Sequence, residues 1–187
     1  DEFVMTLDNG NLILRNNTPV AIAGIGVVQL DANTVQIPLS SITNGFSLDA
    51  GLGDDILQLS TELVLLGPDN GLTLNSLDVL LTGTGTLELH ALNVTDGIYD
   101  TNGLTTNVTT EANFFENATL SGTGTITGIV NMNADSTFNP GTSPGILNTG
   151  DLTLDNNNNN FEVNGPVPGT DHDQVVVTGT VIIAPGT

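Results

Sequence analysis

The chain has 187 residues, of which 21 are acidic and only 1 is basic, so its formal net charge is −20. A single arginine cannot supply the basic surface that nucleic-acid binding needs, nor the basic cluster of a peripheral membrane anchor. The lack of cysteine excludes disulfides, thiolate zinc sites and cysteine nucleophiles, and no apolar run of about 18 residues offers a membrane span.

Glycine, asparagine and threonine take the place of the missing charged residues. Charged residues make up only 12% of the chain, which contains 22 Gly, 23 Asn and 27 Thr. Helix-forming residues are scarce, whereas β-branched and turn-forming residues recur throughout. A hydrophobic share of 38% is enough for a folded core. The composition therefore predicts an all-β fold. The near absence of lysine, arginine and cysteine favours an extracellular bacterial protein that resists trypsin-like cleavage and thiol oxidation.

The N-terminal part of the chain, 1–60, is a β segment for which two arrangements stay open. The alternating stretch Phe3–Leu7 is typical of a strand. Asn-Gly pairs at Asn9 and Asn44 favour tight reversals, because both residues tolerate positive φ. The segment is either an antiparallel β cap or the first, irregular coils of a larger β structure. We expect regular structure from residue 61 to residue 187.

An acidic turn lies near the end of this N-terminal segment. Residues 50–57, Ala-Gly-Leu-Gly-Asp-Asp-Ile-Leu, resemble one copy of the calcium-binding nonapeptide repeat G-G-x-G-x-D-x-U-x. The resemblance implies calcium as a ligand, because calcium prefers several carboxylate and carbonyl oxygens. A single copy needs further ligands from elsewhere, and the alternative is a solvated acidic turn. The candidate calcium ligands are Asp49, Asp54 and Asp55.

A repeated motif predicts the fold of residues 61–187. Leu81–Leu87 (Leu-Thr-Gly-Thr-Gly-Thr-Leu) matches Leu120–Ile126 (Leu-Ser-Gly-Thr-Gly-Thr-Ile) at a distance of 39 positions, which suits two coils of about 20 residues each. Such coils indicate a parallel β-solenoid. Strand alternation predicts that leucine, isoleucine and glycine point inward and threonine points outward. The residues expected in the interior are Gly83, Gly85, Leu87, Leu89, Gly122, Gly124, Ile126, Leu152, Leu154, Val175 and Val177.

The outward threonines form a candidate binding surface. Threonine in regular rows on a flat β face can order water, bind ice or contact glycans, but it is also the ordinary residue of an exposed strand position. Asn-x-Thr sequons are candidates for glycan attachment, although so Asn- and Thr-rich a chain produces such triplets by composition alone. The surface comprises Thr82, Thr84, Thr86, Thr123 and Thr125, and the sequons begin at Asn16, Asn93, Asn107 and Asn117.

The C-terminal block, residues 138–185, carries four motifs in a regular order. They are Asn-Pro-Gly-Thr-Ser-Pro-Gly at 139–145, Gly-Asp-Leu-Thr-Leu at 150–154, Phe-Glu-Val-Asn-Gly at 161–165, and Gly-Thr-Asp-His-Asp-Gln-Val-Val-Val-Thr-Gly-Thr-Val at 169–181. The block resembles the passenger-associated repeat of autotransporters and related bacterial surface proteins. This resemblance implies a right-handed parallel β-helix and a structural role without a reaction. Residues 35–59 carry a less defined resemblance to large extracellular bacterial proteins.

Two motifs that suggest enzymes have simpler structural interpretations. Residues 141–145, Gly-Thr-Ser-Pro-Gly, match the G-x-S-x-G string of hydrolases, but Pro144 lacks the backbone N–H that the oxyanion hole requires. In the triplet from Asp171 to Asp173, alternation places His172 opposite both aspartates. In the resembled repeat, the aspartate that matches Asp173 belongs to the fold. We therefore expect no enzymatic activity.

These features predict a non-enzymatic structural protein: a stalk, filament or surface-layer building block of a bacterial cell surface. The alternative is a carbohydrate- or surface-binding adhesin domain, although 6 Phe, 1 Tyr and no Trp offer few aromatic platforms for sugars. The apolar strand 181–183 precedes a final turn without a further strand, so we expect self-association or a larger parent chain. In that self-association the strand carrying Phe3, Met5 and Leu7 complements the strand carrying Val181 and Ile183.

Overall fold

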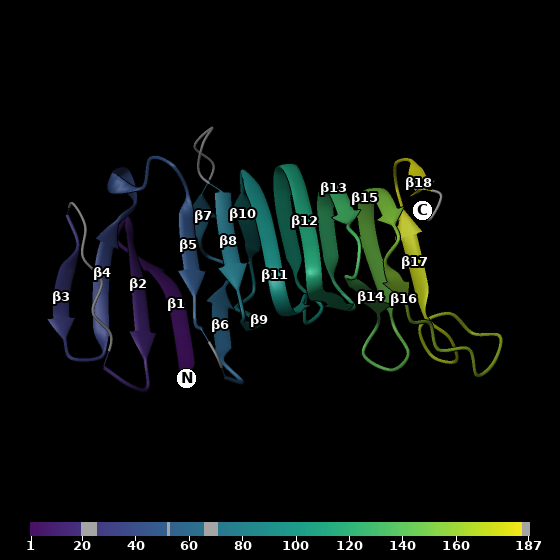
Figure 1. The fold of residues 1–187 in the computed structure, drawn as a ribbon, viewed down its shortest axis with the longest axis horizontal. Helices are drawn as coiled ribbons and strands as arrows, with labels where there is room; N and C mark the ends of the chain where they lie inside the picture. Colours follow the sequence, from purple (N-terminus) through teal and green to yellow (C-terminus); the bar gives the residue numbers. More distant parts are fainter. Residues whose placement is uncertain (20–25, 52, 66–70, 185–187) are drawn as a thin grey trace.

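The computed structural model shows an all-β protein and describes residues 1–19, 26–51, 53–65 and 71–184. Parallel strands stack into a β-solenoid of about five turns, and the strands follow one another along the long axis of the molecule (Figure 1). Over the described ranges, the only helical element is η1 (Leu39–Ser41), a single 3-10 turn. The prediction of an all-β parallel solenoid is confirmed.

Four strands at the N-terminal end form an antiparallel sheet in the order β3–β4–β2–β1. Asn9 and Gly10, with φ angles of 47° and 77°, form the two-residue turn between β1 and β2. A type I′ hairpin turn needs positive φ at both positions, which explains the Asn-Gly pair. Of the two arrangements left open by the sequence, the antiparallel cap is the one observed for these strands. They are β1 (Glu2–Asp8), β2 (Asn11–Asn16), β3 (Val28–Asp31) and β4 (Thr34–Pro38).

The cap joins the solenoid through the second edge of β1. Along this edge β1 runs parallel to β6 (Ile56–Ser60). Phe3 and Met5 of β1 are 6% and 0% exposed and belong to the same core as the solenoid leucines. The next strand after the cap, β5 (Phe46–Asp49), pairs only in parallel, so the change from antiparallel to parallel pairing falls between β4 and β5.

The coils stack in three parallel ladders, and the longer strands bend at corners and contribute to more than one of them. Ladder one runs β5–β8–β11–β12–β13–β15–β18. Ladder two runs β1–β6–β9–β11–β12–β14–β16. Ladder three runs β7–β10–β12–β13–β15–β17. The strands not yet given are β7 (Val64–Leu65), β8 (Gly71–Asn75), β9 (Asp78–Thr82), β10 (Thr86–Leu89), β11 (Ala91–Asp100), β12 (Thr105–Gly122), β13 (Thr125–Met132), β14 (Thr137–Pro140), β15 (Ile146–Asp155), β16 (Asn158–Asn159), β17 (Gln174–Val177) and β18 (Val181–Ala184).

The strand register confirms the coil length inferred from the repeat. Thr86 pairs with Thr105, and Thr105 pairs with Thr125, so the three residues lie one above another on successive coils. These two steps together span the 39 positions that separate the two motif copies. The two copies are therefore equivalent corners that lie two coils apart.

Two apolar rows fill the interior of ladder one along its length. Most predicted interior residues are buried, and Leu154, Val175 and Val177 are half-buried against the same core. Because each row adds one side chain per coil, each middle coil buries its apolar residues against the coils on either side. The Leu72 row consists of Leu72, Leu92, Ala112, Val130, Leu152 and Val181, and the Leu74 row of Leu74, Val94, Phe114, Met132, Leu154 and Ile183.

The glycines of the two motif copies differ from the prediction in part. The sequence predicts Gly83 and Gly85 in the interior, but both lie exposed at the corner between β9 and β10. Gly122 and Gly124 are buried as expected. A Cβ atom on Gly124 would lie 2.0 Å from the carbonyl oxygen of Leu104, whereas at Gly85 the nearest atom would be 3.6 Å away. The motif thus marks a corner in both copies, and at its second glycine only the later copy is tight.

One corner of the solenoid places a non-glycine residue in the left-handed region on five successive coils. The φ angles at this corner lie between 50° and 65°, a conformation that L-residues other than asparagine and aspartate seldom adopt. The repetition shows that the corner geometry belongs to the fold. We call this the left-handed corner, and its residues are Ser76, Asp96, Glu116, Asp135 and Asn156.

Candidate functional site

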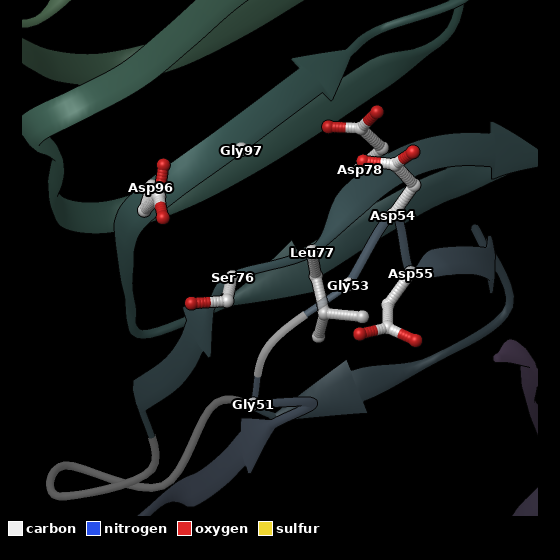
Figure 2. Close-up of a pocket in the computed structure, with 9 residues that line it drawn as sticks. All are labelled: Gly51, Gly53, Asp54, Asp55, Ser76, Leu77, Asp78, Asp96 and Gly97. Carbon is white, nitrogen blue, oxygen red and sulfur yellow. The ribbon is translucent and has the colours of Figure 1, made fainter.

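The predicted calcium turn forms one wall of a surface notch of about 260 Å³ (Figure 2). Exposed carboxylates come from the turn itself, from the start of β9 and from the left-handed corner. Because β6, β9 and β11 are adjacent in ladder two, their preceding corners meet at this point. We call this the acidic notch, and it is lined by Gly51, Gly53, Asp54, Asp55, Ser76, Leu77, Asp78, Asp96 and Gly97.

The three predicted calcium ligands do not converge on one point. Asp49 accepts a hydrogen bond from the backbone N–H of Gly51 at 3.0 Å and does not line the notch. Asp54 is exposed whereas Asp55 is 5% exposed, since successive residues of an extended chain point to opposite sides. In Figure 2 the Asp54 carboxylate lies beside that of Asp78, and the Asp55 carboxylate points away from both. Over the described residues no three acidic or histidine side chains gather to hold a metal ion, so the three predicted ligands are not brought together in this structure.

Two carboxylates of the notch have structural partners. The α-amino group of Asp1 donates to Oδ1 of Asp55 and forms an ion pair with it. Oδ2 of Asp55 is buried and has no hydrogen-bond partner among the described residues. Oδ1 of Asp78 accepts the backbone N–H of Ile98 at 2.9 Å, which ties β9 to β11. These side chains therefore hold neighbouring coils together.

The predicted threonine surface is not one flat array. Thr82 donates to the carbonyl oxygen of Leu59 in ladder two at 3.4 Å, and Thr84 is exposed at the corner before β10. Thr123 packs at another corner, between Gly103 and Gly145. Only Thr86 and Thr125 lie in one outward row, with Thr105 between them. Sequence reasoning missed Thr105, although the period of the repeat would have found it.

A neighbouring outward row in ladder three is cross-linked by side chains. Nδ2 of Asn107 donates to Oε2 of Glu88 at 2.6 Å on the coil before it. Oγ1 of Thr127, on the coil after it, donates to Oδ1 of Asn107. This row places its polar atoms against one another, so few of them remain for a ligand.

An asparagine row runs along the outside of ladder one. Nδ2 of Asn113 donates to Oδ1 of Asn93 at 3.1 Å, and Nδ2 of Asn131 donates to Oδ1 of Asn113 at 2.9 Å. Each amide thus links two successive coils, as in the side-chain ladders of stacked in-register sheets. Sequence reasoning missed this row because its members stand in different local motifs.

The enzyme-like motifs have structural roles. Oγ of Ser143 donates to the carboxylate of Glu162, with distances of 3.1 and 3.0 Å to its two oxygens. The imidazole of His172 contacts the carbonyl oxygen of Gly165 through Nδ1 at 3.0 Å. Asp173 is buried and accepts the backbone N–H groups of Gly145 and Glu162, each at 2.8 Å. The expected structural role of Asp173 is confirmed, because it fastens two loops that lie far apart in the sequence.

The buried tyrosine of the core is held neutral. Burial raises the pKa of the Tyr99 phenol well above its usual range, and its 2.8 Å hydrogen bond with Oγ1 of Thr106 acts in the opposite direction. Its ring packs edge-on against Phe114, with ring centroids 6.1 Å apart. Tyr99 is therefore a packing residue that satisfies its own hydroxyl.

A second depression, of about 360 Å³, lies on the outside of ladder one near its N-terminal end. Its lining combines small residues of β5, β8 and β11 with asparagine, serine, threonine and histidine side chains. We call this the outer groove, and it is lined by Asn44, Gly45, Phe46, Ser47, Gly71, Thr73, His90, Ala91 and Asn93.

The predicted assembly residues differ sharply between the two ends of the chain. β1 pairs with β2 on one edge and with β6 on the other, and Phe3 and Met5 are buried, while Leu7 is half-buried. The prediction that this strand is free to complement another is therefore wrong. At the other end Val181 and Ile183 are 51% and 74% exposed, because no described strand covers the outer edge of β18.

Comparisons with protein-family models, with curated proteins and with solved structures found no match to this chain. Among the described residues, there is no helix with the length and apolar character needed to cross a membrane.

Proposed function

We propose that this chain is a non-enzymatic structural element of the bacterial cell exterior: a stalk, filament or surface-layer building block that grows by stacking of coils. The observation that carries the proposal is the pair of apolar rows, which run through ladder one without interruption and end uncovered at Val181 and Ile183. Any further coil of the same width continues such a row, whether the coil belongs to a second copy or to a larger parent chain. Repeat proteins are stabilised in this way by contacts between nearest neighbours.

The C-terminal end supports stacking as the mode of growth. Of the 14 exposed large apolar side chains among the described residues, 7 follow residue 160. Within residues 71–184, β17 and β18 each pair on one side only, with β15, so no described strand pairs with their other edges. Open, flat strand edges with apolar side chains are templates for pairing with another chain.

The charge distribution supports contact through the ends. A net charge of −20 on one molecule opposes broad side-by-side packing of two copies. The scarcity of basic and thiol groups supports an extracellular location. The polar rows on the outside of ladders one and three already bond to themselves, which suits a passive rod.

Sedimentation velocity over a wide concentration range tests this function. We expect the wild-type chain to form larger species as concentration rises, and the double variant Val181→Lys/Ile183→Lys to remain a monomer. The matched control is Ile129→Lys, which alters a side chain that is 40% exposed in the middle of the rod. A wild-type chain that stays monomeric throughout, or an Ile129→Lys variant that loses association equally, would contradict growth through the C-terminal coil.

The second candidate function, a carbohydrate- or surface-binding adhesin, is favoured by the outer groove. Its volume of about 360 Å³ and its lining of asparagine, serine, threonine and histidine side chains suit a neutral sugar. Glycan-array binding tests this function. We expect binding of a neutral glycan that Thr73→Lys abolishes, and the absence of any bound glycan would count against the adhesin.

A further inference from the structure

The four Asn-x-Thr sequons differ in how far the folded chain has already used their side chains. Asn16 is 8% exposed, and its Nδ2 donates to Oγ1 of Thr18 at 2.9 Å. Nδ2 of Asn107 donates to Glu88 at 2.6 Å. Asn93 holds Asn113 in the asparagine row through its Oδ1. An acceptor for a glycan needs a free amide nitrogen on an exposed side chain. The amide nitrogens of Asn16 and Asn107 are already bonded, and Asn93 is half-buried with its Oδ1 held by Asn113.

Asn117 is different, because a β-bulge pushes it out of the ladder. The register between β11 and β12 shifts between Thr95 and Gly97. Across this shift only Asp96 stands on β11, whereas both Glu116 and Asn117 stand on β12. A bulge leaves its extra residue unpaired and redirects its side chain. Asn117 is exposed and makes no side-chain hydrogen bond within the described residues.

The threonine of the same sequon lies on the same side of the strand. Asn117 and Thr119 are exposed and half-exposed, while Ala118 between them is buried. Alternate side chains of a strand point to one face, so the asparagine and the threonine share the outer face. No described residue hydrogen-bonds the Thr119 hydroxyl. The amide and the hydroxyl that together define the sequon are thus presented outward and unoccupied.

We propose that Asn117 is an N-glycosylation site of the folded chain and that the other three sequons are not. The sugar donor is a hexose activated as a nucleoside diphosphate. The amide nitrogen Nδ2 of Asn117 forms a bond with the anomeric carbon, the bond between that carbon and the phosphate oxygen breaks, the nucleoside diphosphate leaves with the electron pair, and the amide releases one proton. A neutral sugar adds no charge beside Glu116, and Asn117 is exposed.

The test uses the purified, folded full chain with a soluble N-glycosyltransferase and a nucleotide-activated hexose. The enzyme is first shown to modify a synthetic peptide of residues 113–121. If the folded protein then remains unmodified, the fold and not the sequence of the sequon is the cause. Peptide mapping by mass spectrometry locates each added hexose. We expect one hexose, on Asn117, and its loss in Asn117→Gln and in Thr119→Val.

The matched control is Thr109→Val, which destroys the sequon at Asn107 and should leave the hexose count unchanged. A folded chain that remains unmodified while the peptide is glycosylated overturns the proposal. Hexose on Asn16, Asn93 or Asn107 of the folded chain, with or without Asn117, overturns it as well. Circular dichroism before and after the reaction verifies that the modified chain is still folded.

Discussion

The middle coils and the last coil carry the same sequence pattern but differ in burial. In the Leu72 row, Leu92 and Val130 are 0% exposed and Leu152 is 3% exposed, while Val181 at the end of the row is 51% exposed. In the Leu74 row, Phe114 and Met132 are 0% exposed and Ile183 is 74% exposed. The residues are of the same kind, and their strands pair in the same parallel way. The difference is the presence of a second neighbouring coil.

This comparison locates the stability of the molecule at the interfaces between coils. A side chain of a middle coil is covered from both sides, so its removal leaves a cavity between two layers. A side chain of the last coil is covered from one side, and its removal exposes little that water does not already reach.

The largest effect is expected when a side chain of the Leu74 row is shortened to alanine, once in a middle coil and once in the last coil. Phe114→Ala should lower the free energy of unfolding by about 3–5 kcal/mol, because it leaves a cavity and removes the contact with Tyr99. Ile183→Ala should change it by no more than about 0.5 kcal/mol. Urea unfolding followed by circular dichroism measures both. Equal losses in the two variants would show that the last coil is covered in solution, as in an assembled filament.

A second pair of variants compares the two copies of the repeated motif. Gly124→Ala should destabilise the chain by about 1–3 kcal/mol, because its Cβ would lie 2.0 Å from the carbonyl oxygen of Leu104. Gly85→Ala should leave stability within about 0.5 kcal/mol of the wild type, since its nearest neighbour would be 3.6 Å away. Thermal unfolding of the two variants, measured side by side with the wild type, gives the loss of stability in each. If Gly85→Ala is as damaging as Gly124→Ala, the corners are equally tight.

The contrast between these two corners also shows what the sequence could and could not predict. The repeat of the Gly-Thr-Gly motif was sufficient for the coil length and for the parallel fold. It was not sufficient for the position of the corner, because Leu-Thr-Gly-Thr-Gly reads as a strand with alternating faces. Only the backbone of the neighbouring coil, at Leu104, distinguishes the buried glycine from the exposed one.

The candidate sites differ in how far the sequence could have predicted them. Strand alternation alone is sufficient to predict that Asp54 and Asp55 point to opposite sides. The pairing of β1 with β6 was not predictable, because Glu2 and Ile56 lie far apart in the sequence and no local signal connects them. The asparagine row is equally non-local: its members become neighbours only when the register of every coil is known.

The asparagine row is expected to make a moderate contribution to stability. Asn113→Ala should destabilise the chain by about 1–2 kcal/mol, because Asn113 donates to Asn93 and accepts from Asn131 on the coils to either side. Asn139→Ala, at an exposed position without a side-chain hydrogen bond among the described residues, is the control and should be nearly neutral. The midpoint of chemical unfolding reports both. If Asn113→Ala leaves the unfolding midpoint unchanged, water replaces the hydrogen bonds of the row without loss of stability.

The smallest effect is a gain in stability at the left-handed corner. Glu116 has a φ of 51°, a conformation that asparagine tolerates better than glutamate because its short side chain can bond locally. The corner also places Glu116 between Asp96 and Asp135 on the adjacent coils, and like charges that face each other across strands are destabilising. Glu116→Asn should therefore raise the free energy of unfolding by about 0.5–1 kcal/mol.

Glu116→Gln is the control. It removes the charge but keeps the longer side chain, so it should show only the electrostatic part of the gain in stability. Calorimetry of both variants at low salt separates the two causes. If the glutamine variant is as stable as the asparagine variant, repulsion between neighbouring coils accounts for the whole effect and the backbone conformation contributes nothing.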